Sequence, residues 1–306
     1  MTTEQITEQI TEQITEQVTE TATKAFTTHR NLLFTIVYEL LGSAGDAEEV
    51  LQETWLRWVD SGLTAIRDQR AYLVRLATRQ ALAKLRSLAP SKEAYVGPWL
   101  PEPLLTGPGL AEDVELADSV SMAMLLVLQS LNPTERVVFV LREVFGMEYT
   151  DIGAAVDRTP STVRQIAYRA RNRVAERRPR GVASVAESRR TVDAFRAAVA
   201  AGDRTALLGL LSPEAVLLTD GGGVVRAALA PVVGATPVAE LLCNLAARPA
   251  PEPAQVNGRP ALVLRVDGRP DTVITLRIEN GLITGLYVVR NPEKLSRLER
   301  EIALVR

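Results

Sequence analysis

Residues 149–177, YTDIGAAVDRTPSTVRQIAYRARNRVAER, decide the fold of the helical half of this chain. Two segments of apolar residues at helical spacing flank the turn Asp157-Arg158-Thr159-Pro160. Thr159 carries a side chain that can cap a helix, and Pro160 suits the first helical position. A short helix and a tight turn that lead into a longer basic helix predict a helix-turn-helix.

The longer helix is predicted to have one buried face and one basic face. Between residues 158 and 180, eight arginines oppose the single acid Glu176. Arg and Gln side chains reach base edges in a major groove, whereas further arginines suit phosphates. A solvated basic helix is the alternative, but it leaves the turn and the cap unexplained. The residues predicted to contact DNA are Ser161, Thr162, Arg164, Gln165, Tyr168, Arg169 and Arg171.

The composition of the whole chain narrows the function classes. The 306 residues suit about two domains, and 35 basic residues nearly balance 37 acidic ones. One Cys (Cys243) and one His (His29) cannot form a Cys/His zinc site or an internal disulfide. No apolar run long enough to span a membrane and no secretory signal is evident. We therefore expect a cytoplasmic protein with no metal, no cofactor and no membrane partner.

Residues 27–95 are predicted to form a compact unit of three helices. The middle helix is acidic and carries tryptophans, which suits a basic protein partner. The third helix is basic, which suits nucleic acid. An acidic helix that is only solvated surface remains the alternative. The acidic-helix residues are Asp46, Glu48, Glu49, Gln52, Glu53 and Trp55, and the basic ones are Arg75, Arg79, Lys84 and Arg86.

Two segments differ in composition from these units. Residues 1–26 repeat Thr-Glu-Gln-Ile and are predicted to be a disordered extension, with a partner-binding helix as the alternative. Residues 96–118 are rich in Pro and Gly and contain acids but no basic residue, which predicts a stiff linker. Residues 119–180 then hold the helix-turn-helix, and residues 187–306 turn to an α+β pattern.

The order of an acidic helix, a basic aromatic helix, an acidic linker and a helix-turn-helix resembles a sigma factor of the extracytoplasmic-function group. The resemblance covers residues 27–178. It implies that the acidic helix in region 2 binds the RNA polymerase core and that region 2 opens promoter DNA. It also implies that region 4, the helix-turn-helix, binds the upstream promoter element.

Three further motifs resemble the sigma-factor subgroup that carries a fused SnoaL-like C-terminal domain. They are Tyr95–Pro103 (YVGPWLPEP), Asp220–Gly223 (DGGG) and Asn291–Leu295 (NPEKL). The implied fold is two all-α domains followed by a cone-shaped α+β domain that modulates the sigma domains in place of an anti-sigma protein. The residues implied at the interdomain contact are Trp99, Pro101, Glu102, Pro103, Asp220, Gly221, Gly222, Gly223, Asn291, Pro292, Glu293, Lys294 and Leu295.

The chain departs from the subgroup's pattern at residues 81–84 (ALAK) and 89–92 (APSK), where charges are missing. These departures put promoter opening in doubt. They motivate an alternative, a sigma-like protein that acts as an enzyme or small-molecule binder through residues 187–306. A simple DNA-binding repressor is a third interpretation, but it gives the acidic helix no role.

The C-terminal domain lacks the side chains expected of an acid–base enzyme. It contains no His from residue 187 onward, and Asp220 precedes three glycines, which favours a role in a loop. We therefore expect no catalytic residue. Small apolar residues either form core or line a cavity for a small apolar ligand, and core is the favoured interpretation; they are Ala228, Ala230, Val232, Val233 and Leu241.

Overall fold

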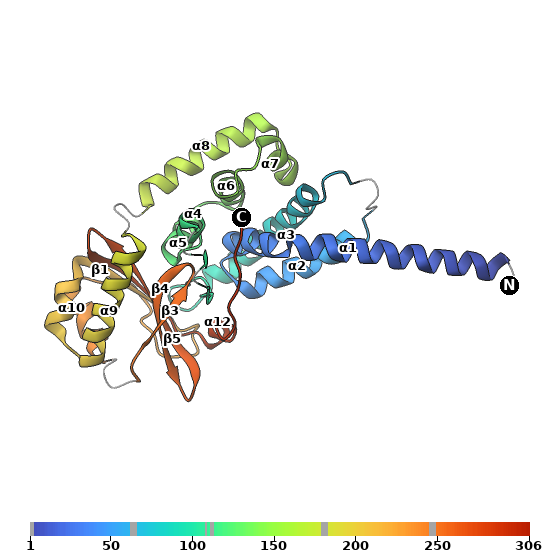
Figure 1. The fold of residues 1–306 in the computed structure, drawn as a ribbon. Coiled ribbons are helices and arrows are strands. Elements are labelled where there is room, and N and C mark those ends of the chain that lie inside the picture. The colour runs from blue at the N-terminus through green and yellow to red at the C-terminus, as the bar shows by residue number, and fades with distance from the viewer. Residues whose placement is uncertain (1–2, 62–65, 108, 111–112, 179–182, 245–248) are drawn as a thin grey trace.

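The structure is a computed structural model that describes residues 3–61, 66–107, 109–110, 113–178, 183–244 and 249–306, with side chains from residue 19 onward. Figure 1 shows a helical half, which begins with a long projecting helix, and a half that contains a sheet. The predicted fold class, helical domains followed by an α+β domain, is confirmed.

The first helical unit contains α1 (Thr3–Leu41), α2 (Ala44–Val59) and α3 (Gln69–Glu93). The three helices pack on one another. Their shared core includes four fully buried residues, Leu33, Val37, Trp58 and Leu73. Apolar residues at 3.6-residue spacing place these side chains on one stripe of each helix. The predicted three-helix unit is therefore present.

The prediction of disorder for residues 1–26 is wrong where the structure describes them, because residues 3–26 continue α1. Ala22 is buried, and its carbonyl accepts a 2.9 Å hydrogen bond from Nε1 of Trp58. Phe26 packs edge-on against Trp55, with 5.3 Å between ring centroids. The tryptophans of α2 thus give the end of this segment an apolar surface that composition did not reveal. Met1 and Thr2 lie outside the described residues.

The second helical unit contains α4 (Val114–Ser119), α5 (Met122–Gln129), α6 (Pro133–Phe139), a π-helical continuation η3 (Val140–Val144), α7 (Tyr149–Val156) and α8 (Pro160–Arg177). The bounds predicted for α7 and α8 are confirmed, because local signals set them. Thr159 caps α8 by accepting from the backbone N–H of Thr162 at 3.3 Å. Asp157 ends α7 in the left-handed conformation, at φ 57°.

The C-terminal domain begins with α9 (Val185–Ala201) and α10 (Arg204–Leu210) and ends with α12 (Pro292–Leu295). Its sheet has the strand order β2-β1-β6-β5-β4-β3, in which β1 and β6 are parallel and the other neighbours antiparallel. The strands are β1 (Leu211–Asp220), β2 (Val232–Val233), β3 (Glu252–Val256), β4 (Arg259–Val266), β5 (Arg269–Glu279) and β6 (Leu282–Val289). A further helix, α11 (Ala235–Cys243), follows β2.

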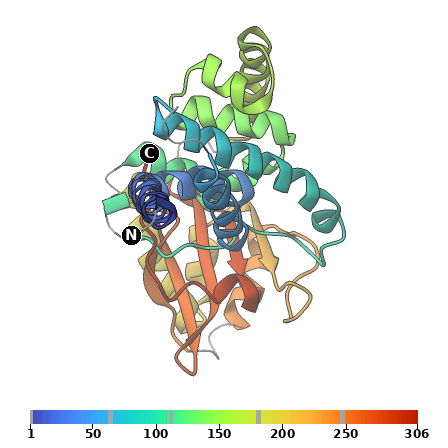
Figure 2. The ribbon, with the colours of Figure 1, turned by 90° about the vertical axis from the view of Figure 1, so that its right-hand side faces the viewer.

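The two faces of the sheet have different partners, because side chains alternate along each strand. One face packs under α9, α10 and α11, with Phe195, Leu207 and Leu286 in its core. The other face packs against the linker and α5 through residues such as Leu100 and Met122. Figure 2 shows this sheet beneath the helices of the first unit. The sheet is therefore covered on both faces, once by its own helices and once by the rest of the chain.

The expectations for small apolar residues of the C-terminal domain are met only in part. Val233 is 61% exposed and Ala230 is also exposed, so neither is core. Ala228 and Leu241 line a cavity instead. Cys243 is half-buried at the end of α11. From the sequence, His29 is expected at the start of the first helix, but it lies within α1, because the helix begins upstream.

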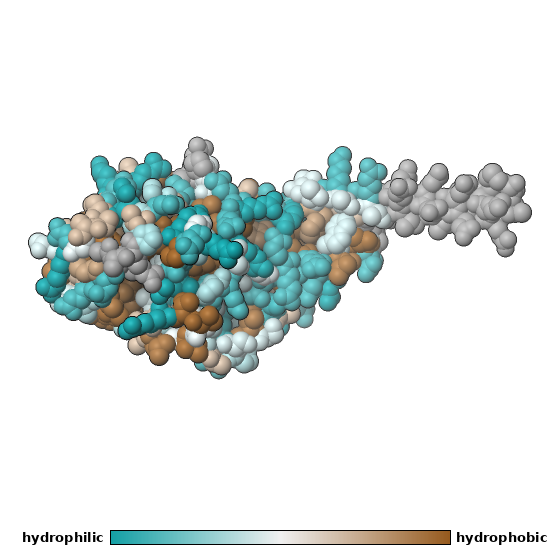
Figure 3. Space-filling model, turned by 90° about the horizontal axis from the view of Figure 1, so that it is seen from below, coloured by the Kyte–Doolittle hydropathy of each residue, from teal (hydrophilic) through white to brown (hydrophobic). Residues whose placement is uncertain are grey.

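No helix among the described residues is long and apolar enough to cross a membrane. The face seen in Figure 3 is largely hydrophilic, and apolar side chains show between the hydrophilic ones.

Candidate nucleic-acid interface and interdomain contact

The helix-turn-helix presents the predicted DNA-contacting residues on its outer face. Arg164, Gln165, Tyr168, Arg169 and Arg171 are all exposed, and Tyr168 is 62% exposed. The opposite face of α8 is buried, as predicted, through Val163, Ile166, Ala167, Ala170 and Val174. In Figure 1 this helix runs along the outside of the molecule, away from the sheet. The exposed row has the shape and charge that a major groove accepts.

Some of these side chains are already oriented by neighbours. The guanidinium of Arg164 lies over the ring of Tyr149, 5.3 Å from its centroid. Arg171 pairs with Glu143 at 3.6 Å. The Ser161 and Thr162 hydroxyls lie 3.0 and 2.9 Å from that of Thr159, so both belong to the helix start.

The acidic face of α2 is accessible, and its N-terminus is fixed by a residue far away in sequence. Ser43 caps the helix, and Glu102 Oε2 accepts the backbone N–H of Ala44 at 2.8 Å. A negative carboxylate at this position also complements the helix dipole. From the sequence, Asp46 is also expected to start this helix, but the helix begins two residues earlier, at Ala44. Among the predicted polymerase-binding residues, Glu49, Gln52 and Glu53 are exposed, and Asp46, Glu48 and Trp55 are half-buried.

The basic residues of α3 differ in their availability. Lys84 Nζ pairs with Glu49 at 2.7 Å and Asp46 at 3.2 Å, and its hydrogen bond with Glu49 raises the lysine's pKa. Arg79 Nη2 donates to the carbonyl of Ala154 in α7 at 2.7 Å. Arg75 lies over the ring of Tyr72, and Arg86 is exposed. The structure therefore brings Lys84 together with the acidic helix and Arg79 together with the helix-turn-helix.

Asp220 is the centre of the contact between the linker and the C-terminal domain. It ends β1 and is 1% exposed. Its Oδ1 accepts from the hydroxyl of Tyr95 at 2.6 Å and from the N–H of Gly222 at 3.1 Å. Its Oδ2 accepts from the N–H of Leu100 at 2.8 Å and from Lys294 Nζ at 2.7 Å. Four donors thus satisfy one buried carboxylate, which is an interdomain contact and not only the loop position expected from sequence.

Trp99 lies between two lysines. The Nζ of Lys92 is 3.6 Å from the ring centroid and that of Lys294 is 4.1 Å away. The pKa of Lys92 is lowered to about 7, mostly by burial and in part by the charges of Arg136 and Lys294. Burial likewise lowers the pKa of Lys294, against the opposing effect of Asp220. One tryptophan therefore joins region 2, the linker and the C-terminal domain.

The other motif residues pack around this centre. A Cβ on Gly222 (φ +65°) would lie 2.5 Å from the Asn291 amide, so only glycine fits beside it. The Asn291 side chain donates to the Tyr95 hydroxyl at 2.9 Å and accepts from the Glu293 N–H at 3.0 Å. The buried motif residues are Pro101, Glu102, Pro103, Asp220, Gly221, Asn291 and Leu295; Trp99, Gly222 and Lys294 are half-buried; Gly223, Pro292 and Glu293 are exposed.

A second contact, through Asn257, was missed from sequence. Asn257 is 1% exposed, and its Nδ2 donates to the Tyr38 hydroxyl at 2.6 Å and to the Val120 carbonyl at 2.9 Å. Its Oδ1 accepts from the Leu104 N–H at 3.0 Å. One side chain in the C-terminal domain thus touches region 2, the linker and the start of region 4. An Asn-Gly pair predicts a tight turn, and nothing local shows its contacts.

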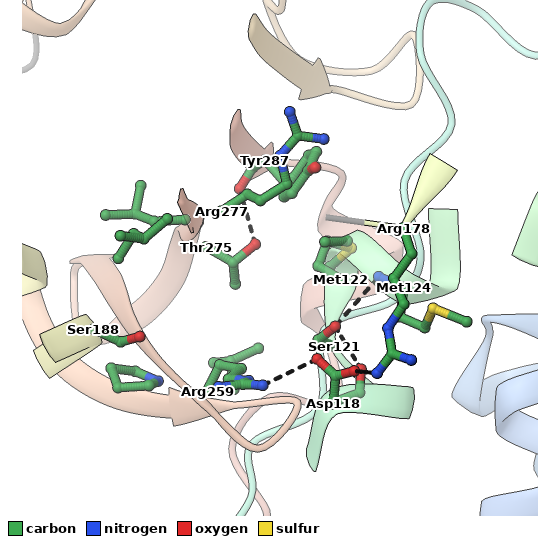
Figure 4. A pocket seen from close by; sticks show the side chains of 15 residues that line it. Asp118, Ser121, Met122, Met124, Arg178, Ser188, Arg259, Thr275, Arg277 and Tyr287 are labelled. Atoms are coloured by element: carbon green, nitrogen blue, oxygen red, sulfur yellow. Dashed lines mark hydrogen bonds and ion pairs between the residues drawn. The ribbon is translucent and has the colours of Figure 1, made fainter. Parts of the chain in front are cut away.

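Asp118 forms a third contact at the edge of a small interdomain pocket. Figure 4 shows it between Arg259 of β4 and Arg178, which follows α8. Asp118 Oδ1 lies 3.1 Å from Arg259, and Oδ2 lies 2.5 Å from Arg178. Asp118, at the acidic end of the linker, therefore links the end of α8 to the sheet.

The last residues of the chain return to the helical half. Leu304 is 6% exposed within the helical core, and the Val305 N–H donates to Thr35 Oγ1 at 3.0 Å. The Ile302 N–H donates to the Leu105 carbonyl at 2.9 Å, and Arg306 pairs with Asp113 at 2.8 Å. The predicted linker is therefore held on both sides, and α4 begins within it.

Comparison with known proteins agrees with this arrangement. Residues 25–90 match the family "Sigma-70 region 2", and residues 121–174 match "Sigma-70, region 4". The ECF RNA polymerase sigma factor SigJ of Mycobacterium tuberculosis is 32% identical over 89% of this chain and 92% of its own length. The probable ECF RNA polymerase sigma factor SigI of the same organism is 32% identical over 91% of this chain and 96% of its own.

A solved structure is similar along the same length. The crystal structure of M. tuberculosis SigJ superimposes with a TM-score of 0.73 at 30% identity and covers 90% of this chain and 98% of its own. The match includes the helical units and the C-terminal sheet together. The chain therefore belongs to the extracytoplasmic-function sigma factors of RNA polymerase.

Proposed function

We propose that this protein directs promoter-specific transcription initiation by binding core RNA polymerase through α2 and promoter DNA through α8 and α3. The observation that carries the proposal is the row of exposed residues on α8, Arg164, Gln165, Tyr168 and Arg169, on a helix whose start and buried face are fixed. Bidentate Arg and Gln contacts can read bases, and the remaining arginines bind phosphates. This assignment places the protein in the cytoplasm with its polymerase.

The acidic face of α2 is proposed as the polymerase contact. Gln52 and Glu53 are exposed beside the half-buried Trp55, which combines charge with an aromatic anchor. Arg75 and Arg86 of α3 are proposed to contact the DNA that region 2 opens, joined by Arg79 and Lys84 once their present partners are released.

The C-terminal domain is proposed to modulate these activities by holding the two sigma domains together. The bond of Arg79 to the Ala154 carbonyl joins the two helical units and occupies one of the residues proposed to bind DNA. The contacts of Asp220, Asn257 and Asp118 hold the linker between them. The two segments that depart from the subgroup's pattern, residues 81–84 and 89–92, lie on α3, the helix that also carries Arg79 and Lys84.

The test uses the purified protein with core polymerase and DNA fragments that the wild-type holoenzyme selects from a random library. We expect Arg164→Ala with Gln165→Ala to lower upstream-element binding by at least tenfold, because each bidentate base contact contributes about 1–3 kcal/mol. The matched control is Arg189→Ala with Arg190→Ala, two exposed residues of α9. An unchanged promoter response in the α8 variant would overturn the recognition assignment. Failure of the wild type to bind core polymerase would overturn the function itself.

A further inference from the structure

A cavity of about 780 Å³ lies on the helix-bearing face of the C-terminal sheet, beside α11. Its volume is within the roughly 300–1,000 Å³ that is usual for small-molecule sites. The floor is apolar, because Leu217, Leu242 and Val288 are each less than 10% exposed. The cavity can therefore cover the hydrocarbon part of a ligand.

The polar part of the cavity is basic. Arg226 and Arg290 both line it, and no acidic side chain is among its described lining residues. Nη1 of Arg290 donates to the Arg226 carbonyl at 2.7 Å, and Nη2 lies 3.4 Å from both carboxylate oxygens of Asp271. These contacts fix the orientation of the guanidinium. Asp271 offsets part of its charge, and Arg226 adds a second, exposed positive charge.

The Arg290 side chain lines the cavity, but its Nε does not face it. This nitrogen is buried and has no hydrogen-bond partner among the described residues. The cavity attracts a negatively charged group through the positive charges of Arg226 and Arg290, which both line it. Arginine binds carboxylates through two parallel N–H donors, and such charge-assisted bonds are stronger than neutral ones.

We propose that this cavity binds a small organic carboxylate with an apolar body. A purely apolar molecule would leave the charges of Arg226 and Arg290 without a counter-charge, and a small inorganic anion would leave the apolar floor uncovered. The proposed ligand site depends only on the C-terminal domain. The ligand site and the proposed sigma function can therefore be refuted independently.

The cavity adjoins the Asp220 contact through two strand ends. Thr219 and Arg290 line the cavity, while the next residues, Asp220 and Asn291, contact Tyr95 on the interdomain side. Successive residues of an extended chain point to opposite sides. The Arg290 N–H also donates to the Asp220 carbonyl at 2.7 Å. A ligand in the cavity would thus sit one residue away from the contact that joins the domains.

The experiment measures binding of octanoate to the full-length protein by titration calorimetry. We expect saturable binding of octanoate, with 1-octanol, octylammonium, acetate and inorganic phosphate each at least tenfold weaker. If 1-octanol binds as tightly as octanoate, the site does not require a carboxylate. If acetate or phosphate binds as tightly, the site does not require an apolar body. Absence of saturable octanoate binding would overturn the site.

Two variants locate the binding. Arg226→Gln removes the exposed positive charge, and Leu241→Glu places a negative charge on an α11 residue that is 43% exposed and lines the cavity. Both sites are accessible, so the fold should tolerate either change, and thermal unfolding without ligand checks this. We expect each variant to weaken octanoate binding at least tenfold, while Arg189→Gln on α9 leaves it unchanged. Unchanged binding in both cavity variants would refute this location.

Discussion

The hydroxyl of Tyr95 donates a 2.6 Å hydrogen bond to Oδ1 of Asp220, a residue 125 positions later in the chain. The bond joins the end of region 2 to the sheet of the C-terminal domain. Because Lys294 and the Leu100 N–H bind the other oxygen, the carboxylate is a single point that fixes three segments. The relative position of the domains therefore depends on few buried polar groups.

Asp220→Asn should lower the free energy of unfolding by about 3–5 kcal/mol, the usual cost of breaking a buried ion pair. An amide nitrogen cannot accept hydrogen bonds, so the donors at one of the two oxygen positions lose their partner. Urea denaturation measures the loss, and Asp267→Asn in an exposed turn is the matched control. Equal stability of both variants would show that the contact does not hold the domains.

Leu304→Ala should destabilise the protein by about 2–5 kcal/mol, because it leaves a cavity in the helical core. The neighbouring Val305 is 41% exposed, and Val305→Ala should cost less than about 0.5 kcal/mol. Chemical denaturation of the two variants compares the positions directly. If both substitutions lower the free energy of unfolding by the same small amount, the end of the chain does not contribute to the core.

Glu39→Gln should make stability less dependent on pH between about 4.5 and 8. Burial raises the pKa of the Glu39 carboxyl to about 8, and the hydrogen bond from Ser119 opposes this shift only in part. In this range the unfolded chain loses the proton while the folded protein keeps it, so the wild type loses stability as pH rises, by at most about 1.4 kcal/mol per pH unit. Denaturation at several pH values measures the slope. A slope that is the same in wild type and variant would contradict the raised pKa.

Arg169→Ala should weaken DNA binding without changing sequence preference, because this exposed arginine is assigned to phosphate. The slope of log affinity against log salt should fall by about one. Binding to selected and scrambled duplexes across a salt series measures both quantities. A changed preference with an unchanged slope would instead assign Arg169 to a base.

The sequence was sufficient to predict those features that depend on residues close together in the chain. The bounds of α7 and α8 follow from Thr159 and Pro160, and the buried row of α8 follows from its period. The three interdomain motifs meet around Asp220, Trp99 and Asn291, as their resemblance to the sigma subgroup implied.

Other features have no local signal. Disorder was expected for residues 1–26, yet Ala22 and Phe26 meet the tryptophans of α2. Asp46 was expected to start α2, yet Glu102 binds the N–H of Ala44 from the linker. Asn257 and Leu304 also act at positions far from their sequence neighbours.

The sequence by itself determined the family, the helix-turn-helix and the two charged helices, because caps, turns and helical periodicity act within a few residues. Only the tertiary structure decided which charges remain available. Lys84, Arg79 and Arg86 are equally basic in the sequence. Folding pairs Lys84 with Glu49 and bonds Arg79 to the Ala154 carbonyl, although Arg79 and Arg86 are both exposed. The availability of a charged group depends on partners brought near it by packing, and packing joins residues that the sequence separates.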